Sequence, residues 1–207
     1  MMDSGTFARR LGNWWHYHKW LVLLAAALLV IGITLFAGWL GQTRPDLRVG
    51  YVAVQAMDQD AAARLQTALE SICEDSNGDG QVLVALEQYI ISFNGTVTDA
   101  NAQMAGMARL SADLRAADGP AIFLLDDPAG LQRSIGALQY LDGAQPPDQP
   151  PYDAENWRQM VYDCRNCWLL AENPDARELY IARRAESLAP ASAASEVLWT
   201  VLTVSAS

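Results

Sequence analysis

A short polar segment places four oxygen ligands at alternate positions, namely Asp75, Asn77, Asp79 and the backbone carbonyl of Gln81. This spacing matches the first half of a calcium-binding loop, in which oxygen atoms surround a hard cation and Gly80 permits the sharp turn. The bidentate glutamate that should close such a loop is missing, because Leu86 occupies the twelfth position from Asp75. A turn between a helix and a strand explains the same residues, since Asn and Gly tolerate left-handed backbone angles. The sequence therefore favours a turn, with calcium as the alternative.

Two cysteines, Cys164 and Cys167, have the spacing of a redox pair, of half a zinc site or of a local disulfide. A zinc site needs two further ligands, but the only histidines, His16 and His18, precede a long apolar segment, and Cys73 alone cannot complete the set. A redox pair usually opens a helix just after a strand, whereas this pair follows a predicted helix. Outside the cytoplasm the sequence favours a structural disulfide, with two free thiols as the next alternative.

A third group of polar residues follows the predicted strands. Asp126 and Asp127 come directly after an apolar run, and Gln55 follows the first strand. Open α/β sheets bind ligands at the carboxyl ends of their strands, so these three residues are the candidates for a ligand crevice. Helix capping is the favoured explanation for Asp127, because Pro128 suits the first position of a helix.

The composition argues against two classes of function. Residues 44–207 contain no histidine, the commonest general base, and the chain has no Gly-rich phosphate loop and no nucleophile elbow. The same residues contain 11 arginines and no lysine against 23 acidic residues, a net charge of −12. Such a domain repels phosphate backbones. We therefore expect neither an enzyme nor a partner for nucleic acid.

The N-terminal part has the pattern of a membrane anchor. The segment from Trp20 to Leu40 contains no charged residue between its ends, and a helix of this length spans the roughly 30 Å hydrocarbon core of a bilayer. Tryptophans lie near both ends, and Arg9, Arg10 and Lys19 precede the segment, which favours a cytoplasmic N-terminus. We expect a cytoplasmic basic tail over residues 1–19, a single transmembrane helix over 20–41 and an extracytoplasmic domain over 44–207. A cleaved signal peptide is less favoured, because the end of the segment offers a poor cleavage site.

Hydrophobic periodicity divides the domain into alternating strands and helices. Strands are predicted at residues 47–54, 81–93, 121–125 and 178–183, and helices at residues 58–73, 99–117, 128–141, 154–162 and 190–204. Four prolines mark an exposed loop at residues 145–152. This order predicts an α/β fold with an open, doubly wound, largely parallel sheet and helices on both faces.

Three stretches, residues 46–54, DSNGDGQVLVALEQY (75–89) and MARLSADLRAADGPAIFLLDD (107–127), resemble one lobe of the type 2 extracellular solute-binding proteins of ATP-binding-cassette (ABC) importers. The resemblance implies a doubly wound lobe that holds its ligand at the carboxyl ends of the strands. A complete member has two lobes, about twice this length, and usually a lipidated cysteine.

The resemblance therefore implies a shortened, membrane-anchored relative. Its expected role is a non-catalytic binding or accessory domain beside an ABC permease or another envelope protein. The alternative is a structural or interaction protein of the cell envelope that binds no small ligand. A calcium-stabilised domain without a transport role is a third hypothesis.

Overall fold

The computed structural model describes residues 20, 23–25, 27–33, 44–95, 99–171 and 173–204, and the chain divides into two compact units, Met1–Thr43 and Arg44–Ser207. The described residues of the first unit are helical. The expected basic tail (residues 1–19) and residues 21–22, 26 and 34–41 of the expected transmembrane helix lie outside the described residues. Among the residues described, no helix is both long enough and apolar enough to cross a membrane. The anchor stays a prediction.

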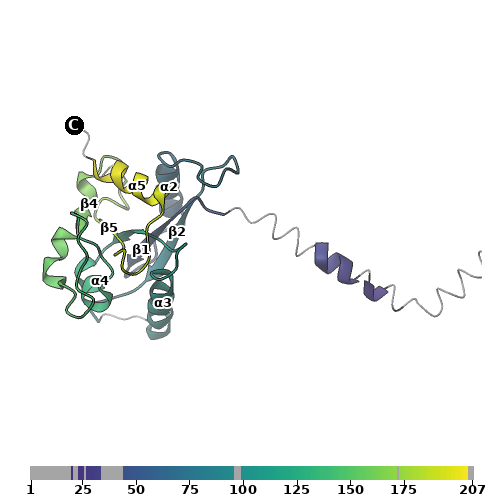
Figure 1. Ribbon diagram of the computed structural model, residues 1–207, viewed down its shortest axis with the longest axis horizontal. Helices are drawn as coiled ribbons and strands as arrows, with labels where there is room; N and C mark the ends of the chain where they lie inside the picture. Colours follow the sequence, from purple (N-terminus) through teal and green to yellow (C-terminus); the bar gives the residue numbers. More distant parts are fainter. Residues whose placement is uncertain are drawn as a thin grey trace, which may run out of the picture. The chain divides into compact units, whose positions relative to one another are not determined.

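The second unit contains a sheet with helices around it (Figure 1). Its described residues form the strands β1 (Leu47–Ala53), β2 (Val84–Ile90), β3 (Ile122–Leu125), β4 (Val161–Asp163) and β5 (Tyr180–Arg183). They also form the helices α2 (Gln59–Glu70), α3 (Ala100–Asp113), α4 (Pro128–Ile135) and α5 (Ala193–Thr203), with the 3-10 helices η1 (Ala154–Gln159) and η2 (Cys164–Asn166).

Up to α4 the element order follows the prediction. Side chains of Asp58 and Asp99 cap α2 and α3 by accepting hydrogen bonds from backbone N–H groups in the first turn. Helix α4 is shorter than predicted, because Gly136 adopts a left-handed conformation (φ 68°) and ends the helix there. Of the helix predicted over residues 154–162, residues 154–159 form the 3-10 helix η1, and the last residues were wrong because β4 begins at Val161.

The sheet has the strand order β2-β1-β3-β5-β4. Strand β1 pairs in parallel with β2 and β3, whereas β5 pairs antiparallel with both β3 and β4. The α/β class is therefore confirmed, but the sheet is mixed and less parallel than predicted. The physical reason lies between β4 and β5, where the described residues form only η2 and turns. A parallel neighbour needs a crossover connection, usually an α-helix, and without one the two strands run antiparallel.

Helices cover both faces of the sheet. One hydrophobic core joins α2 and α5 to the face that carries Val49 and Tyr51, and the other joins α3 and α4 to the face that carries Val52. Figure 1 shows the two pairs of helices on opposite sides of the strands. All four residues of β3 are buried, as predicted for a strand covered on both faces.

Candidate functional site

The sheet changes its direction of winding between β1 and β3. The chain passes from β1 through α2 to β2 on one side, then through α3 to β3 on the other side of β1. In open α/β sheets the connections after such neighbouring strands diverge and leave a crevice at the carboxyl ends. For this chain the crevice position is the one occupied by the residues after Ala53 and after Leu125.

Asp126 is joined to the end of β1. The backbone N–H of Val54 donates to Asp126 Oδ2 at 2.9 Å, and the backbone N–H of Asp126 donates to the carbonyl of Val52 at 3.3 Å. Desolvation by the surrounding protein raises the pKa of Asp126, the Val54 bond opposes this, and the neighbouring carboxylate of Asp127 raises it further. Gln55 follows Val54 in the chain, and its side chain is exposed. The fold thus brings the predicted positions 55 and 126 to one edge of the sheet.

Asp127 caps the helix that begins there. Its Oδ1 accepts a hydrogen bond from the backbone N–H of Gly130 at 2.8 Å, and Pro128 is the first residue of α4. The capping role predicted for Asp127 is confirmed. A Cβ at position 130 would overlap the side chains of Phe93 and Asp127, so the close packing of the loop after β2 requires glycine here.

Sequence reasoning missed two glutamines that hold the loops around this edge. Gln88 Oε1 accepts from the backbone N–H of Met57 at 3.0 Å, which fixes the connection from β1 to α2. Gln103 bonds both backbone groups of Ser92, accepting from its N–H at 2.8 Å and donating to its carbonyl at 2.9 Å. The sequence shows these amides, but only the strand register and the packing of α3 reveal their partners.

The oxygen atoms of the calcium-like segment are turned towards its own backbone. Asp75 accepts from the N–H groups of Gly78 and Gly80 at 2.6 and 2.8 Å, Asn77 Oδ1 from Asp79 N–H at 2.8 Å, and Asp79 Oδ1 from Gln81 N–H at 2.9 Å. Within the described part of the chain, no group of three His, Cys, Asp or Glu side chains is placed to hold a metal ion. A cation would have to compete with these backbone donors, so the geometry favours the turn interpretation.

Asp46, which the sequence analysis did not single out, fastens this segment to β1. Its Oδ1 accepts from the backbone N–H groups of Ser76 and Asn77 at 2.8 and 3.0 Å, and its Oδ2 accepts from Leu83 N–H at 2.9 Å. Burial acts to raise the pKa of Asp46, but the N–H groups of Leu83, Ser76 and Asn77 outweigh it and hold the pKa below its usual value.

The cysteine pair lies in the core and not at a surface. Cys164 and Cys167 are 0% and 1% exposed, and both are free thiols in the structure; the expected disulfide stays a prediction. They belong to the core on the α5 side of the sheet, and burial raises the pKa of the Cys164 thiol. A buried thiol with a raised pKa, such as that of Cys164, is a poor nucleophile and a poor metal ligand. The pair therefore behaves as core packing in this arrangement.

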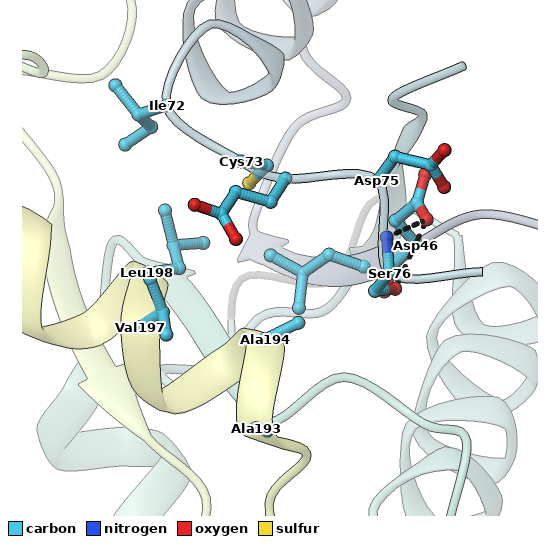
Figure 2. Close-up of a pocket in the computed structure, with 11 residues that line it drawn as sticks. Asp46, Ile72, Cys73, Asp75, Ser76, Ala193, Ala194, Val197 and Leu198 are labelled. Atoms are coloured by element: carbon cyan, nitrogen blue, oxygen red, sulfur yellow. Dashed lines mark hydrogen bonds between the residues drawn. The ribbon is translucent and has the colours of Figure 1, made fainter. Parts of the chain in front are cut away.

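A cavity of about 210 Å³ lies at the amino end of β1, the end opposite to Asp126. Its apolar walls come from Leu47, from Ile72 and Cys73 after α2, and from the start of α5, as Figure 2 shows for Ala194, Val197 and Leu198. Asp46, Glu74 and Asp75 supply carboxylates at its border. Burial raises the pKa of the Cys73 thiol to about 11, so this thiol is protonated at neutral pH. This cavity has no signal in the sequence, because the α5 wall lies more than a hundred residues after the walls from residues 46–47 and 72–76.

Comparisons with protein-family models, with curated proteins and with solved structures find no match. The resemblance to a solute-binding lobe therefore stays a prediction. The two ends of β1 thus differ: the carboxyl end meets Asp126, and the amino end borders the apolar cavity.

Proposed function

We propose that this chain is a membrane-anchored extracytoplasmic domain that binds a small polar solute, or assists a transporter that does, without catalysing a reaction. In this proposal it is a shortened relative of the solute-binding lobes of ABC importers, with its N-terminus in the cytoplasm. Its partners are the lipid bilayer and an ABC permease or another envelope protein. The observation that carries the proposal is the contact between Val54 and Asp126 at the carboxyl ends of β1 and β3, where the winding of the sheet reverses.

The charge of this edge indicates the class of solute. Asp58 caps α2 and Asp60 lies in its first turn, in the connection after β1, and Asp126 and Asp127 follow β3. Four carboxylates at neighbouring strand ends produce a negative potential that attracts cations and repels anions. Asp126 is exposed, so its carboxylate is accessible to a solute. We therefore expect a cationic or neutral hydrogen-bonding solute.

Thermal denaturation of residues 44–207, which form a compact unit of their own, tests the proposal. A library of amino acids, amines, sugars and short peptides should contain a compound that raises the melting temperature, because a ligand that binds only the folded state stabilises it. Asp126→Asn should reduce that rise. Asp118→Asn, a change of an exposed aspartate outside this edge, is the matched control and should leave the rise unchanged.

The absence of any response to the library would favour the alternative, an envelope interaction protein without a small ligand. A rise with calcium that Asp79→Ala abolishes would instead support the calcium-stabilised domain. The anchor is tested separately by carbonate extraction of membranes that contain the full chain, since a spanning helix is retained and a peripheral protein is released.

A further inference from the structure

The cavity at the amino end of β1 is separate from the edge at Asp126 and has the size of a small organic molecule. It lies between the segment after α2 and the start of α5, and Figure 2 shows apolar side chains from both segments around it. An apolar cavity of about 150 Å³ can hold a benzene molecule. This cavity, at about 210 Å³, therefore has room for one aromatic ring and a short chain.

The border of the cavity is acidic. Among the described residues that line it are three carboxylates, those of Asp46, Glu74 and Asp75, and no lysine, arginine or histidine. The first residues of α5 also line it, and the amino end of a helix carries about half a positive charge. Three negative charges outweigh this half charge, so the potential at the cavity attracts cations and repels anions.

Glu74 is the carboxylate that a ligand can engage directly. Asp46 accepts hydrogen bonds from three backbone N–H groups, and Asp75 accepts from those of Gly78 and Gly80. Glu74 is exposed and makes no hydrogen bond or ion pair with any residue that the structure describes. Both of its oxygen atoms are therefore available to accept hydrogen bonds from a cationic group.

The combination of apolar walls and a free carboxylate selects the class of ligand. A metal ion fits poorly, because apolar walls offer it no ligands and no group of three His, Cys, Asp or Glu side chains in the described part of the chain is placed to hold one. An uncharged apolar molecule would leave the Glu74 carboxylate without a partner. A molecule with an apolar body and an ammonium group satisfies both features.

We propose that this cavity binds a small primary amine with an apolar body, of the arylalkylamine class. The ring lies among the apolar side chains from the segment after α2 and from α5, such as Ile72 and Val197, and the ammonium group donates to the Glu74 carboxylate. This inference goes beyond the proposed function, because the cavity and the edge at Asp126 lie at opposite ends of β1.

Modification of Cys73 in the full chain reports on the occupancy of the cavity. Cys73 lines the cavity, whereas Cys164 and Cys167 are buried. The thiol reagent is methyl methanethiosulfonate, and intact mass spectrometry follows the reaction at about pH 8, where a primary amine stays protonated. The probe is 2-phenylethylamine. At ten times its Kd it should lower the rate at Cys73 about ten-fold, because only the unoccupied cavity exposes the thiol.

Two further probes separate the charge from the apolar body. The anion 3-phenylpropanoate keeps the ring and replaces the ammonium group with a carboxylate, and ethylamine keeps the ammonium group and lacks the ring. Neither should protect Cys73 at the concentration at which 2-phenylethylamine does. Equal protection by 3-phenylpropanoate would overturn the role of the charge, and equal protection by ethylamine would overturn the role of the apolar walls. The absence of protection by 2-phenylethylamine would overturn the site.

Substitutions at the cavity test the two contacts. Glu74→Gln should raise the concentration of 2-phenylethylamine needed for half protection about five-fold, whereas Glu155→Gln, at an exposed position outside the cavity, should leave it unchanged. Val197→Phe fills the cavity from an exposed position and should remove the effect of the amine. Unchanged protection in both cavity variants would overturn the inference.

Asp126→Asn distinguishes this site from the edge in the proposed function. Protection of Cys73 should be the same in this variant as in the native chain, because Asp126 is not among the residues that line the cavity. Loss of protection in Asp126→Asn would overturn the inference.

Discussion

Asp46→Ala removes the carboxylate that joins the 75–83 segment to the start of β1. The Asp46 side chain accepts three backbone hydrogen bonds, from Ser76, Asn77 and Leu83, at 2.8 to 3.0 Å. Hydrogen bonds to a charged group contribute about 1.5–3 kcal/mol each, and partial exposure reduces this to about 1 kcal/mol. The substitution should therefore lower the free energy of unfolding by roughly 2–3 kcal/mol.

The assay is thermal unfolding followed by circular dichroism. For a domain of this size, 1 kcal/mol shifts the melting temperature by roughly 2–4 °C, so Asp46→Ala should lower it by roughly 4–12 °C. Asp79→Ala is the matched control, because the Asp79 carboxylate accepts a single backbone bond, from Gln81 at 2.9 Å, on an exposed turn. Its effect should be clearly smaller. Equal effects of the two substitutions would refute the assigned role of Asp46.

The pH dependence gives a second measurement on the same variant. The folded state lowers the pKa of Asp46, so its stabilisation is present above the unfolded pKa of about 3.9 and is lost as the pH falls through the lower folded pKa. The difference in stability between the native chain and Asp46→Ala should be constant near pH 7 and should shrink below about pH 4. A difference that is independent of pH would show that the carboxylate charge is not its cause.

Folding raises the pKa of Asp126, so the stabilising contribution of this side chain is complete at low pH and is lost as the pH rises through the folded pKa. In urea titrations above about pH 4, Asp126→Asn should therefore be more stable than the native chain. A loss of stability would contradict this. Arg184 is 3% exposed and donates to the carbonyls of Ala116 and Pro190 at 3.1 and 3.0 Å. In the same titrations, Arg184→Ala should lower the free energy of unfolding by about 2–4 kcal/mol. The control, Arg133→Ala at an exposed position, should lower it by about 0.5 kcal/mol or less. Thiol titration of the chain unfolded without reductant should give three equivalents, whereas one equivalent would restore the predicted disulfide.

Local signals in the sequence determined the strands and helices of the first half of the domain. The alternation from Leu47 onward predicted β1, the apolar run from Ala121 predicted the buried strand β3, and Asp127 with Pro128 predicted the start of α4. Each signal acts within a few residues of its position, through side-chain alternation, continuous burial or capping of free N–H groups. Such features can be recognised in the sequence without knowledge of the fold.

The second half was harder to predict, because its elements depend on neighbours that are distant in the chain. Strand β4 has three residues and forms only by pairing with β5, so its sequence carries almost no signal of its own. The periodicity at residues 154–162 favoured an α-helix, but the chain forms the 3-10 helix η1 and then turns into the sheet. Tertiary pairing outweighed the local preference there.

The candidate site divides in the same way. The sequence by itself determined the residue types at positions 55, 126 and 127 and their place after strands, because the end of a strand can be read locally. Only the tertiary structure decided that the N–H of Val54 meets Asp126, that Asp46 holds the calcium-like turn, and that Val197 borders a cavity with Ile72. These contacts join residues that are 25 or more positions apart in the chain. They depend on the order of the strands and on the packing of α5, because no local preference brings such distant residues together.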